Sequence, residues 1–100
     1  MPYFVYMLRC SDGSYYIGMT NNLERRITEH ITGGEPEAYT FSRRPVHLVW
    51  SEEFPTHDDA FNREHQIKGW SRKKKEALIH NDFQAIRTIE QEEKQRMHKK

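Results

Sequence analysis

Residues 3–20 read YFVYMLRCSDGSYYIGMT, two runs of strand-forming residues on either side of a turn signal. The first run, Tyr3 to Cys10, and the second, Tyr15 to Thr20, are rich in the aromatic and branched side chains that favour β-structure. The segment between them, Ser11 to Ser14, contains Asp-Gly, a frequent hairpin turn. Residues 3–20 therefore predict an antiparallel β-hairpin.

The length of the turn determines whether Tyr6 and Tyr16 lie on the same face of this hairpin. A two-residue loop at Asp12-Gly13 places the two tyrosines on opposite faces, because side chains alternate along a strand. A three-residue loop that pairs Tyr6 with Thr20 places both tyrosines on one face. The sequence is compatible with both registers.

Downstream of the hairpin, the pattern predicts one helix, one strand and three further helices. These are a helix that Asn21 or Asn22 caps and Gly33-Gly34 ends, a strand from Val46 to Phe54, a helix from Thr56 to about Trp70, a helix that Ser71 caps, and a final helix carrying Phe83, Ile86 and Ile89. The polar end, Glu90 to Lys100, is predicted to fray into solvent. The order β-β-α-β-α-α-α predicts an α+β fold with a three-stranded antiparallel sheet flanked by helices.

Composition limits the size of the core and the class of protein. The chain has 100 residues, of which 35% are hydrophobic and 31% charged, so we expect one domain with a thin core. Its functional part is expected over residues 1–83, with residues 84–100 as a polar C-terminal helix of the same domain. Cys10 is the only cysteine, which excludes an internal disulfide and a zinc site built on several thiolates.

Location is predicted from the absence of targeting features. No apolar run approaches the roughly 18 residues that span a bilayer, and no signal-like segment precedes the first strand. We therefore expect a soluble protein of the cytoplasm, with no membrane partner.

Helical periodicity distinguishes the two neighbouring arginines of LERRITEH, residues 23–30. The apolar stripe of this helix is formed by Leu23, Ile27 and Ile31. At about 100° per residue, Arg26 and His30 lie at the border of that stripe, whereas Arg25 faces water. Side chains four residues apart can bind one anion together. A solvated charge is the expectation for Arg25, and a hydrogen-bonded boundary histidine is the alternative for His30.

Glu64 lies inside the apolar stripe of the helix expected from Thr56, together with Ala60, Phe61 and Ile67. An unpaired carboxylate would be costly to bury there, so it needs a cation: a metal, Arg26 or a lysine. The sequence is compatible with a structural salt bridge and with a divalent cation held by one carboxylate and water.

Basic residues concentrate between residues 62 and 75, although the net charge of the chain is only +1. This segment holds Arg63, Lys68, Arg72, Lys73, Lys74 and Lys75 against the single acid Glu64. A local excess of positive charge suits phosphate binding, but a lysine run is more often a solvated face.

Taken together, these segments resemble the GIY-YIG nuclease family over residues 3 to about 83, and its small stand-alone bacterial members most of all. Phe4-Val5-Tyr6 stands where the family has Gly-Ile-Tyr, with Phe4 replacing the glycine, and Tyr16-Ile17-Gly18 matches the second element. Residues 16–30, YIGMTNNLERRITEH, resemble the family signature and place its arginine and histidine at Arg26 and His30. Ala60 to Glu64 resembles the segment with the metal-binding glutamate, and Asn81 lies near a later family asparagine.

The resemblance implies the GIY-YIG endonuclease fold and a metal-dependent nuclease that hydrolyses phosphodiester bonds, with DNA favoured over RNA. It implies that Glu64 binds one Mg²⁺ or Mn²⁺ ion and that Arg26 neutralises charge on the phosphate. Tyr6 and Tyr16 would position or deprotonate the attacking water, and His30 would assist by hydrogen bonding. The implied contacts with nucleic acid are Lys68, Arg72, Lys73, Lys74, Lys75 and Asn81.

Two alternatives compete with this hypothesis. The first is a non-catalytic nucleic-acid-binding module that keeps the same residues for structure or phosphate contact. The second is an interaction domain in which Glu64 forms a salt bridge and the polar C-terminal helix is the contact surface. The oligomeric state is open in all three.

Overall fold

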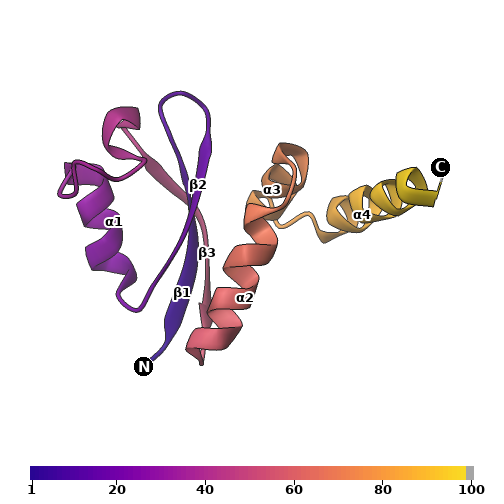
Figure 1. Cartoon of the computed structure of the whole chain (residues 1–100), viewed down its shortest axis with the longest axis horizontal. Helices are drawn as coiled ribbons and strands as arrows, with labels where there is room; N and C mark the ends of the chain where they lie inside the picture. The colour runs from indigo at the N-terminus through magenta and orange to yellow at the C-terminus, as the bar shows by residue number, and fades with distance from the viewer. Residues whose placement is uncertain (99–100) are drawn as a thin grey trace. The chain divides into compact units, whose positions relative to one another are not determined.

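The computed structural model describes residues 1–98, with side chains described for residues 1–96. Its elements are β1 (Tyr3–Arg9), β2 (Tyr15–Thr20), α1 (Leu23–Thr32), a short 3₁₀ turn (Phe41–Arg43), β3 (His47–Phe54), α2 (His57–Lys68), α3 (Arg72–Ile79) and α4 (Phe83–His98). Figure 1 labels the strands and the α-helices. The predicted order of strands and helices is confirmed. None of the helices in this described part is long and apolar enough to cross a membrane.

The residues group into two compact units, Met1–Lys68 and Gly69–Lys100. The first contains the whole sheet with α1 and α2, and the second contains α3 and α4. The expected division into residues 1–83 and 84–100 stays a prediction.

The sheet has the strand order β2-β1-β3, and β1 is antiparallel to both neighbours. Tyr6 pairs with Gly18 and Leu8 pairs with Tyr16, so neither of the two expected registers is adopted. A three-residue loop, Ser11 to Gly13, closes the hairpin one position earlier than the three-residue alternative. This register places Gly13 at the last position of the loop, where the backbone must be left-handed. Gly13 adopts that conformation at φ 84° without steric cost.

The observed register places Tyr6 and Tyr16 on the same face of the sheet. Their ring centroids are 6.3 Å apart. This arrangement meets the geometric condition that the nuclease hypothesis places on the two tyrosines.

Three helices begin at the predicted capping residues. The side chains of Asn22, Thr56 and Ser71 accept hydrogen bonds from backbone N–H groups three residues later, at 3.1, 3.1 and 3.2 Å. Gly33 ends α1 in the left-handed conformation at φ 75°. The side-chain chemistry of the caps therefore predicted these helix boundaries correctly.

Helices cover both faces of the sheet in the first unit, as Figure 1 shows for α1 and α2. On one face, Leu23 and Ile27 of α1 pack against a buried cluster of Tyr6, Leu8, Cys10 and Val46. On the other face, α2 packs against the sheet and buries Ala60 and Ile67. The strands are therefore buried between two helical layers, which explains why β1 is apolar on both faces.

Four sequence predictions about exposure and length are wrong. Ile31, Phe61 and Phe83, which were assigned to apolar stripes, are 53%, 44% and 57% exposed. The segment from Glu90 continues as α4 to His98 instead of fraying, while Lys99 and Lys100 lie outside the described residues. Periodicity alone overestimated the apolar faces, because each helix covers only part of its neighbouring layer.

Candidate active site

The phenol of Tyr6 lies over Gly18 of the neighbouring strand. A Cβ atom on Gly18 would come within 3.0 Å of the Tyr6 hydroxyl and of two carbons of its ring. The side chain of Tyr6 is 1% exposed, and Gly18 is buried with it. The glycine of Tyr16-Ile17-Gly18 is therefore required for the close approach of Tyr6 rather than for a positive φ.

Tyr6 belongs to a buried chain of hydrogen-bonding groups. Its hydroxyl lies 3.0 Å from Nε2 of His30, and Nδ1 of His30 lies 2.6 Å from Oγ1 of Thr40. His30 is 3% exposed and Thr40 is 1% exposed, so His30 is a core residue and not the boundary residue that periodicity predicted. A neutral imidazole accepts at one nitrogen and donates at the other, so Tyr6 and Thr40 take opposite roles toward it.

Burial controls the protonation of this chain. It lowers the pKa of His30, an effect that the positive charge of Arg26 reinforces. Burial also raises the pKa of Tyr6, and the neighbouring Tyr16 raises it further. At neutral pH the imidazole is therefore neutral and the phenol keeps its proton.

Tyr16 extends the cluster toward solvent. Its ring centroid lies 5.1 Å from that of His30, and it stacks on Tyr39 at 5.9 Å and 23°. Cζ of Arg43 lies 3.8 Å from the Tyr39 ring centroid, and Nε of Arg43 lies 3.1 Å from a carboxylate oxygen of Asp12. The loop before β3 thus adds the ring of Tyr39 and the guanidinium of Arg43 next to Tyr16.

Sequence reasoning missed Thr40, Tyr39 and Arg43, because all three lie between the helix that Gly33-Gly34 ends and the strand from Val46, where the sequence predicts no regular element. Their positions depend on how that loop folds back onto β2, which no periodic pattern encodes. Nothing in the sequence around Thr40 distinguishes this buried threonine from an exposed threonine in a loop.

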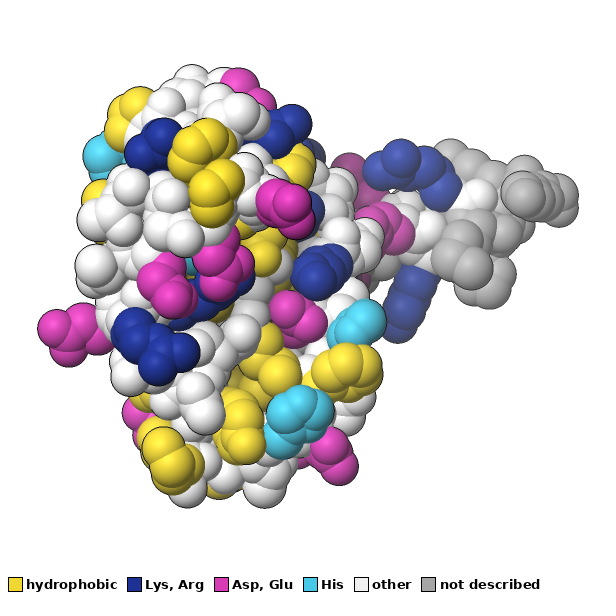
Figure 2. Space-filling view, turned by 60° about the vertical axis from the view of Figure 1, so that its left-hand side comes forward, with side chains coloured by type: hydrophobic (Ala, Val, Ile, Leu, Met, Phe, Trp, Pro, Cys, Tyr) yellow, Lys and Arg dark blue, Asp and Glu magenta, His cyan; other side chains and the backbone are white. Residues whose placement is uncertain are grey.

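Arg26 reaches the same site from α1. Its guanidinium binds the carboxylates of Glu35 at 2.8 Å and Glu29 at 3.4 Å, and its side chain is 24% exposed. Burial by itself would lower the pKa of Arg26, but interactions with Tyr6 and Glu35 raise it overall. Acidic and basic side chains adjoin on the face of the molecule drawn in Figure 2. Arg26 is thus a fixed cation beside the Tyr6 phenol.

Glu64 approaches from α2, which lies on the opposite side of the sheet. Its side chain is 13% exposed, and Nζ of Lys68 lies 3.5 Å from one of its carboxylate oxygens. Of the cations that the sequence offered for Glu64, the structure therefore pairs it with a lysine. After burial and Tyr16, the charge of Glu64 makes the smallest contribution to the raised pKa of Tyr6.

The described residues fit a divalent ion only if one carboxylate holds it and water and substrate supply its other ligands. Among the described residues, no three His, Cys, Asp or Glu side chains gather into a metal-binding group. Mg²⁺ is commonly held by one or two carboxylates together with water and substrate phosphate. The nearly buried carboxylate of Glu64 suits that mode, with Lys68 as the cation that an ion would replace.

The residues expected to contact nucleic acid do not form one solvent-facing row. Lys74 is the clearest correction: its side chain is only 7% exposed, and its Nζ lies 3.0 Å from Glu90 and 3.6 Å from Glu93. The ammonium also lies 4.4 Å from the ring centroid of Trp70. Lys74 is therefore part of the interior of the second unit and is not available to a phosphate.

The remaining basic candidates differ in their partners. Lys68 binds Glu64, and Nε of Arg72 lies 3.4 Å from Glu76. Lys73 and Asn81 are exposed, and Asn81 takes a left-handed conformation at φ 54° between α3 and α4. Lys75 is partly buried.

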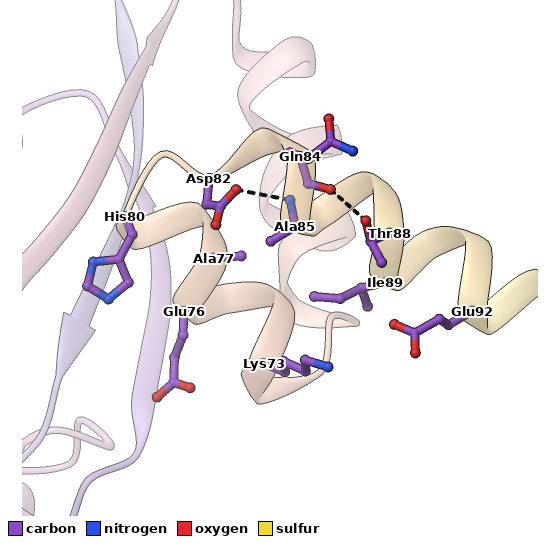
Figure 3. A pocket seen from close by; sticks show the side chains of 10 residues that line it. All are labelled: Lys73, Glu76, Ala77, His80, Asp82, Gln84, Ala85, Thr88, Ile89 and Glu92. Atoms are coloured by element: carbon purple, nitrogen blue, oxygen red, sulfur yellow. Dashed lines mark hydrogen bonds between the residues drawn. The ribbon is translucent and has the colours of Figure 1, made fainter.

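A separate groove of about 700 Å³ lies between α3 and α4 within the second unit. Figure 3 shows Ala77, Ala85 and Ile89 along it, with charged side chains such as Lys73 and Glu92 at its rim. It contains none of the five candidate catalytic residues.

Comparisons with known proteins bear on the family and the fold of the chain. The family model described as the GIY-YIG catalytic domain matches residues 2–77. A UPF0213 protein of Natronomonas pharaonis is 48% identical over 77% of this chain and 89% of its own length, and one of Staphylococcus saprophyticus is 44% identical over 77% and 93%. The solution structure of a UPF0213 protein from Bacillus halodurans is 41% identical, covers 80% of this chain and 84% of its own, and superimposes with a TM-score of 0.53. That of a protein from E. faecalis is 35% identical over 81% and 85%, with a TM-score of 0.57.

Proposed function

The chain belongs to the GIY-YIG catalytic domain family, and on this premise we propose that it is a metal-dependent nuclease that hydrolyses phosphodiester bonds of nucleic acid. One observation carries the proposal. The buried Tyr6 hydroxyl lies 3.0 Å from Nε2 of His30, and the Tyr6 ring lies 6.3 Å from that of Tyr16, beside the guanidinium of Arg26 that Glu35 holds at 2.8 Å. Two phenols and an imidazole brought together from β1, β2 and α1, with a cation on the same helix as the imidazole, form a site suited to phosphate chemistry.

Arg26 supplies the positive charge for the scissile phosphate. In the free protein it is held by Glu29 and Glu35, which keep the guanidinium beside Tyr6. A phosphate that enters the site replaces these carboxylates as its partner, and a bidentate guanidinium stabilises the extra negative charge of the transition state.

Tyr6 positions the reacting groups through its hydroxyl. Because burial raises its pKa, the phenol donates a hydrogen bond rather than acting as a free phenolate. His30 accepts from it or donates to it, and takes the opposite role toward the Thr40 hydroxyl at its other ring nitrogen. Tyr16, which is less buried and stacks on Tyr39, faces the side from which water enters.

Glu64 would hold the Mg²⁺ or Mn²⁺ ion. When bound, the ion polarises the phosphate and stabilises the leaving oxygen. Lys68 neutralises Glu64 in the free protein, and on release it becomes a contact for the flanking backbone. DNA as the preferred substrate and the cytoplasm as the location belong to the same proposal.

A nuclease assay on single-stranded, duplex and branched DNA and on RNA, with and without Mg²⁺ or Mn²⁺, tests the proposal. We expect metal-dependent cleavage that Glu64→Gln abolishes and that Arg26→Ala reduces by roughly 10²- to 10³-fold. Arg25→Ala is the matched control, because Arg25 is the exposed neighbour of Arg26 on the same helix.

Two outcomes would contradict the proposal. Cleavage that survives both Glu64→Gln and chelation of the metal would come from a contaminating enzyme. Binding without cleavage on every substrate would instead support the non-catalytic binding module.

A further inference from the structure

A row of four rings lies on the first unit, and the proposed chemistry does not use it. The ring row consists of Tyr3 of β1 and His57, Phe61 and His65 of α2. The ring centroids of Tyr3 and His57 are 5.4 Å apart at 89°, those of His57 and Phe61 are 6.0 Å apart at 20°, and those of Phe61 and His65 are 4.2 Å apart at 48°. Each ring therefore touches the next.

The ring row faces solvent. Phe61 is 44% exposed, the side chain of His57 is 53% exposed, and His65 is exposed as well. The three residues on α2 follow one another at four-residue spacing, so they lie along one side of the helix. Histidine and hydrophobic side chains also lie next to one another on the face drawn in Figure 2. The core-facing side of α2, in contrast, is formed by Ala60 and Ile67.

The ring row runs beside the proposed metal-binding carboxylate. Glu64 is three residues after Phe61, which places their Cβ atoms about 5–6 Å apart on the helix surface. Lys68 follows one turn further along the same helix, at 50% side-chain exposure. Flat rings, a carboxylate and a cation thus succeed one another along α2.

We propose that the ring row is a stacking platform for unpaired nucleobases, so that the preferred substrate is a single-stranded or locally unpaired nucleic acid. The proposal rests on the nuclease function and names its substrate class. A base that stacks on Phe61 and His65 brings its own phosphate toward Glu64 and Lys68. Stacking suits any base, because every base has a π-face, and it requires that the base be out of a duplex.

The composition of the row favours a nucleobase over a protein partner. It holds one phenol, one phenylalanine between two imidazoles and no aliphatic side chain, and the α2 residues Asp58, Asn62 and Gln66 are exposed as well. A stable protein interface buries about 800 Å² on each partner around an apolar centre. The ring row offers instead narrow, flat surfaces next to a phosphate-binding cation.

The test measures the affinity of the full chain for nucleic acid at equilibrium. A chelator is present to remove divalent metal and so prevent cleavage. The probes are a fluorescent single strand of roughly ten thymidines, the same backbone with abasic sites in place of its bases, and a duplex of equal length. We expect the wild type to bind the single strand more tightly than the other two. Phe61→Ser is expected to weaken single-strand binding by about 5- to 150-fold and to leave abasic binding unchanged, because one stacking contact is lost.

Two further substitutions of Phe61 distinguish the effect of its flat ring from the effect of its hydrophobic volume. Phe61→Leu keeps an apolar side chain without a flat face and should bind as weakly as Phe61→Ser, whereas Phe61→Trp should restore binding. Phe83→Ser is the matched control, because Phe83 is also an exposed phenylalanine, at 57% against 44% for Phe61, and lies outside the ring row.

Several results would overturn the platform. Equal loss of single-strand and abasic binding in Phe61→Ser would show a general effect on the fold or charge. Unchanged single-strand binding, with cleavage that still depends on Glu64 and Arg26, would refute the platform and leave the nuclease intact. If light scattering gave a lower molecular mass for Phe61→Ser than for the wild type, the ring row would be a contact between copies of the chain. If the wild type bound none of the probes and cleaved nothing, both proposals would fall together.

Discussion

Substitution of Gly18 by alanine tests the geometry of the site without relying on any activity. The new methyl group would lie within 3.0 Å of the Tyr6 hydroxyl and two of its ring carbons, whereas ordinary van der Waals contact begins at 3.4 Å. Tyr6 cannot yield freely, because it is 1% exposed and bonded to His30. Overpacking of this kind costs about 1–3 kcal/mol in folding free energy.

Urea denaturation measures the effect, and Gly34→Ala supplies the control. A Cβ atom on Gly34 would meet nothing closer than 3.7 Å, so this variant should change the free energy of unfolding by less than about 0.5 kcal/mol. If the clash with Tyr6 is the cause, Gly18→Ala should cost much less in a Tyr6→Ala background. The double-mutant cycle should therefore give a coupling of roughly 1–3 kcal/mol.

The same variant has a second consequence if the proposed function holds. The phenol must retreat from the methyl group by roughly 1 Å, and a misplacement of that size can lower the rate of a catalysed step by about 10²-fold. The structural reasoning would be refuted if Gly18→Ala were as stable as the wild type, or if its cost were the same with and without the Tyr6 ring.

Three further predictions concern buried polar groups. Thr40→Val leaves one nitrogen of His30 without a partner and should lower the free energy of unfolding, measured by urea denaturation, by about 1–3 kcal/mol. Thr40→Ser keeps the hydroxyl, so it should lower the free energy of unfolding much less than Thr40→Val. Because burial lowers the folded-state pKa of His30, the unfolded chain binds the extra proton, so stability should fall as the pH drops below about 6.5; His30→Gln should flatten that slope between about pH 7.5 and 5. An equally steep slope in His30→Gln would refute this assignment. Lys74→Ala should destabilise the protein by roughly 1–3 kcal/mol, since it leaves Glu90 and the Trp70 ring without their cation, whereas exposed Lys73→Ala should have little effect; equal effects of the two would contradict the buried position of Lys74.

The site was only partly predictable from the sequence. Arg26 stood out at the border of an apolar stripe and Glu64 inside one, because a charged residue there conflicts with the apolar period. His30 was placed too far out, because a helical angle cannot say how deeply the neighbouring loop covers a residue. Thr40 and Tyr39 could not be found at all, since their loop has no period.

The basic run shows the same limit from the opposite direction. Composition grouped Lys74 with its neighbours as one charged segment, yet α3 turns that lysine inward toward Glu90 and Glu93. Which lysine of four consecutive basic residues is buried depends on acids about 16 and 19 positions later along the chain. Only the packing of α3 against α4 decides it.

The sequence by itself determined the order of strands and helices, the caps at Thr56 and Ser71, and the family, and it limited the cap of α1 to Asn21 or Asn22. These follow from short-range chemistry: alternation along strands, capping hydrogen bonds and the steric freedom of glycine act within a few residues. The tertiary structure alone decided the hairpin register, the crossing of Tyr6 over Gly18 and the burial of His30 against Thr40. These depend on contacts between segments far apart in the chain, whose energies come from close packing and buried hydrogen bonds that no local pattern specifies.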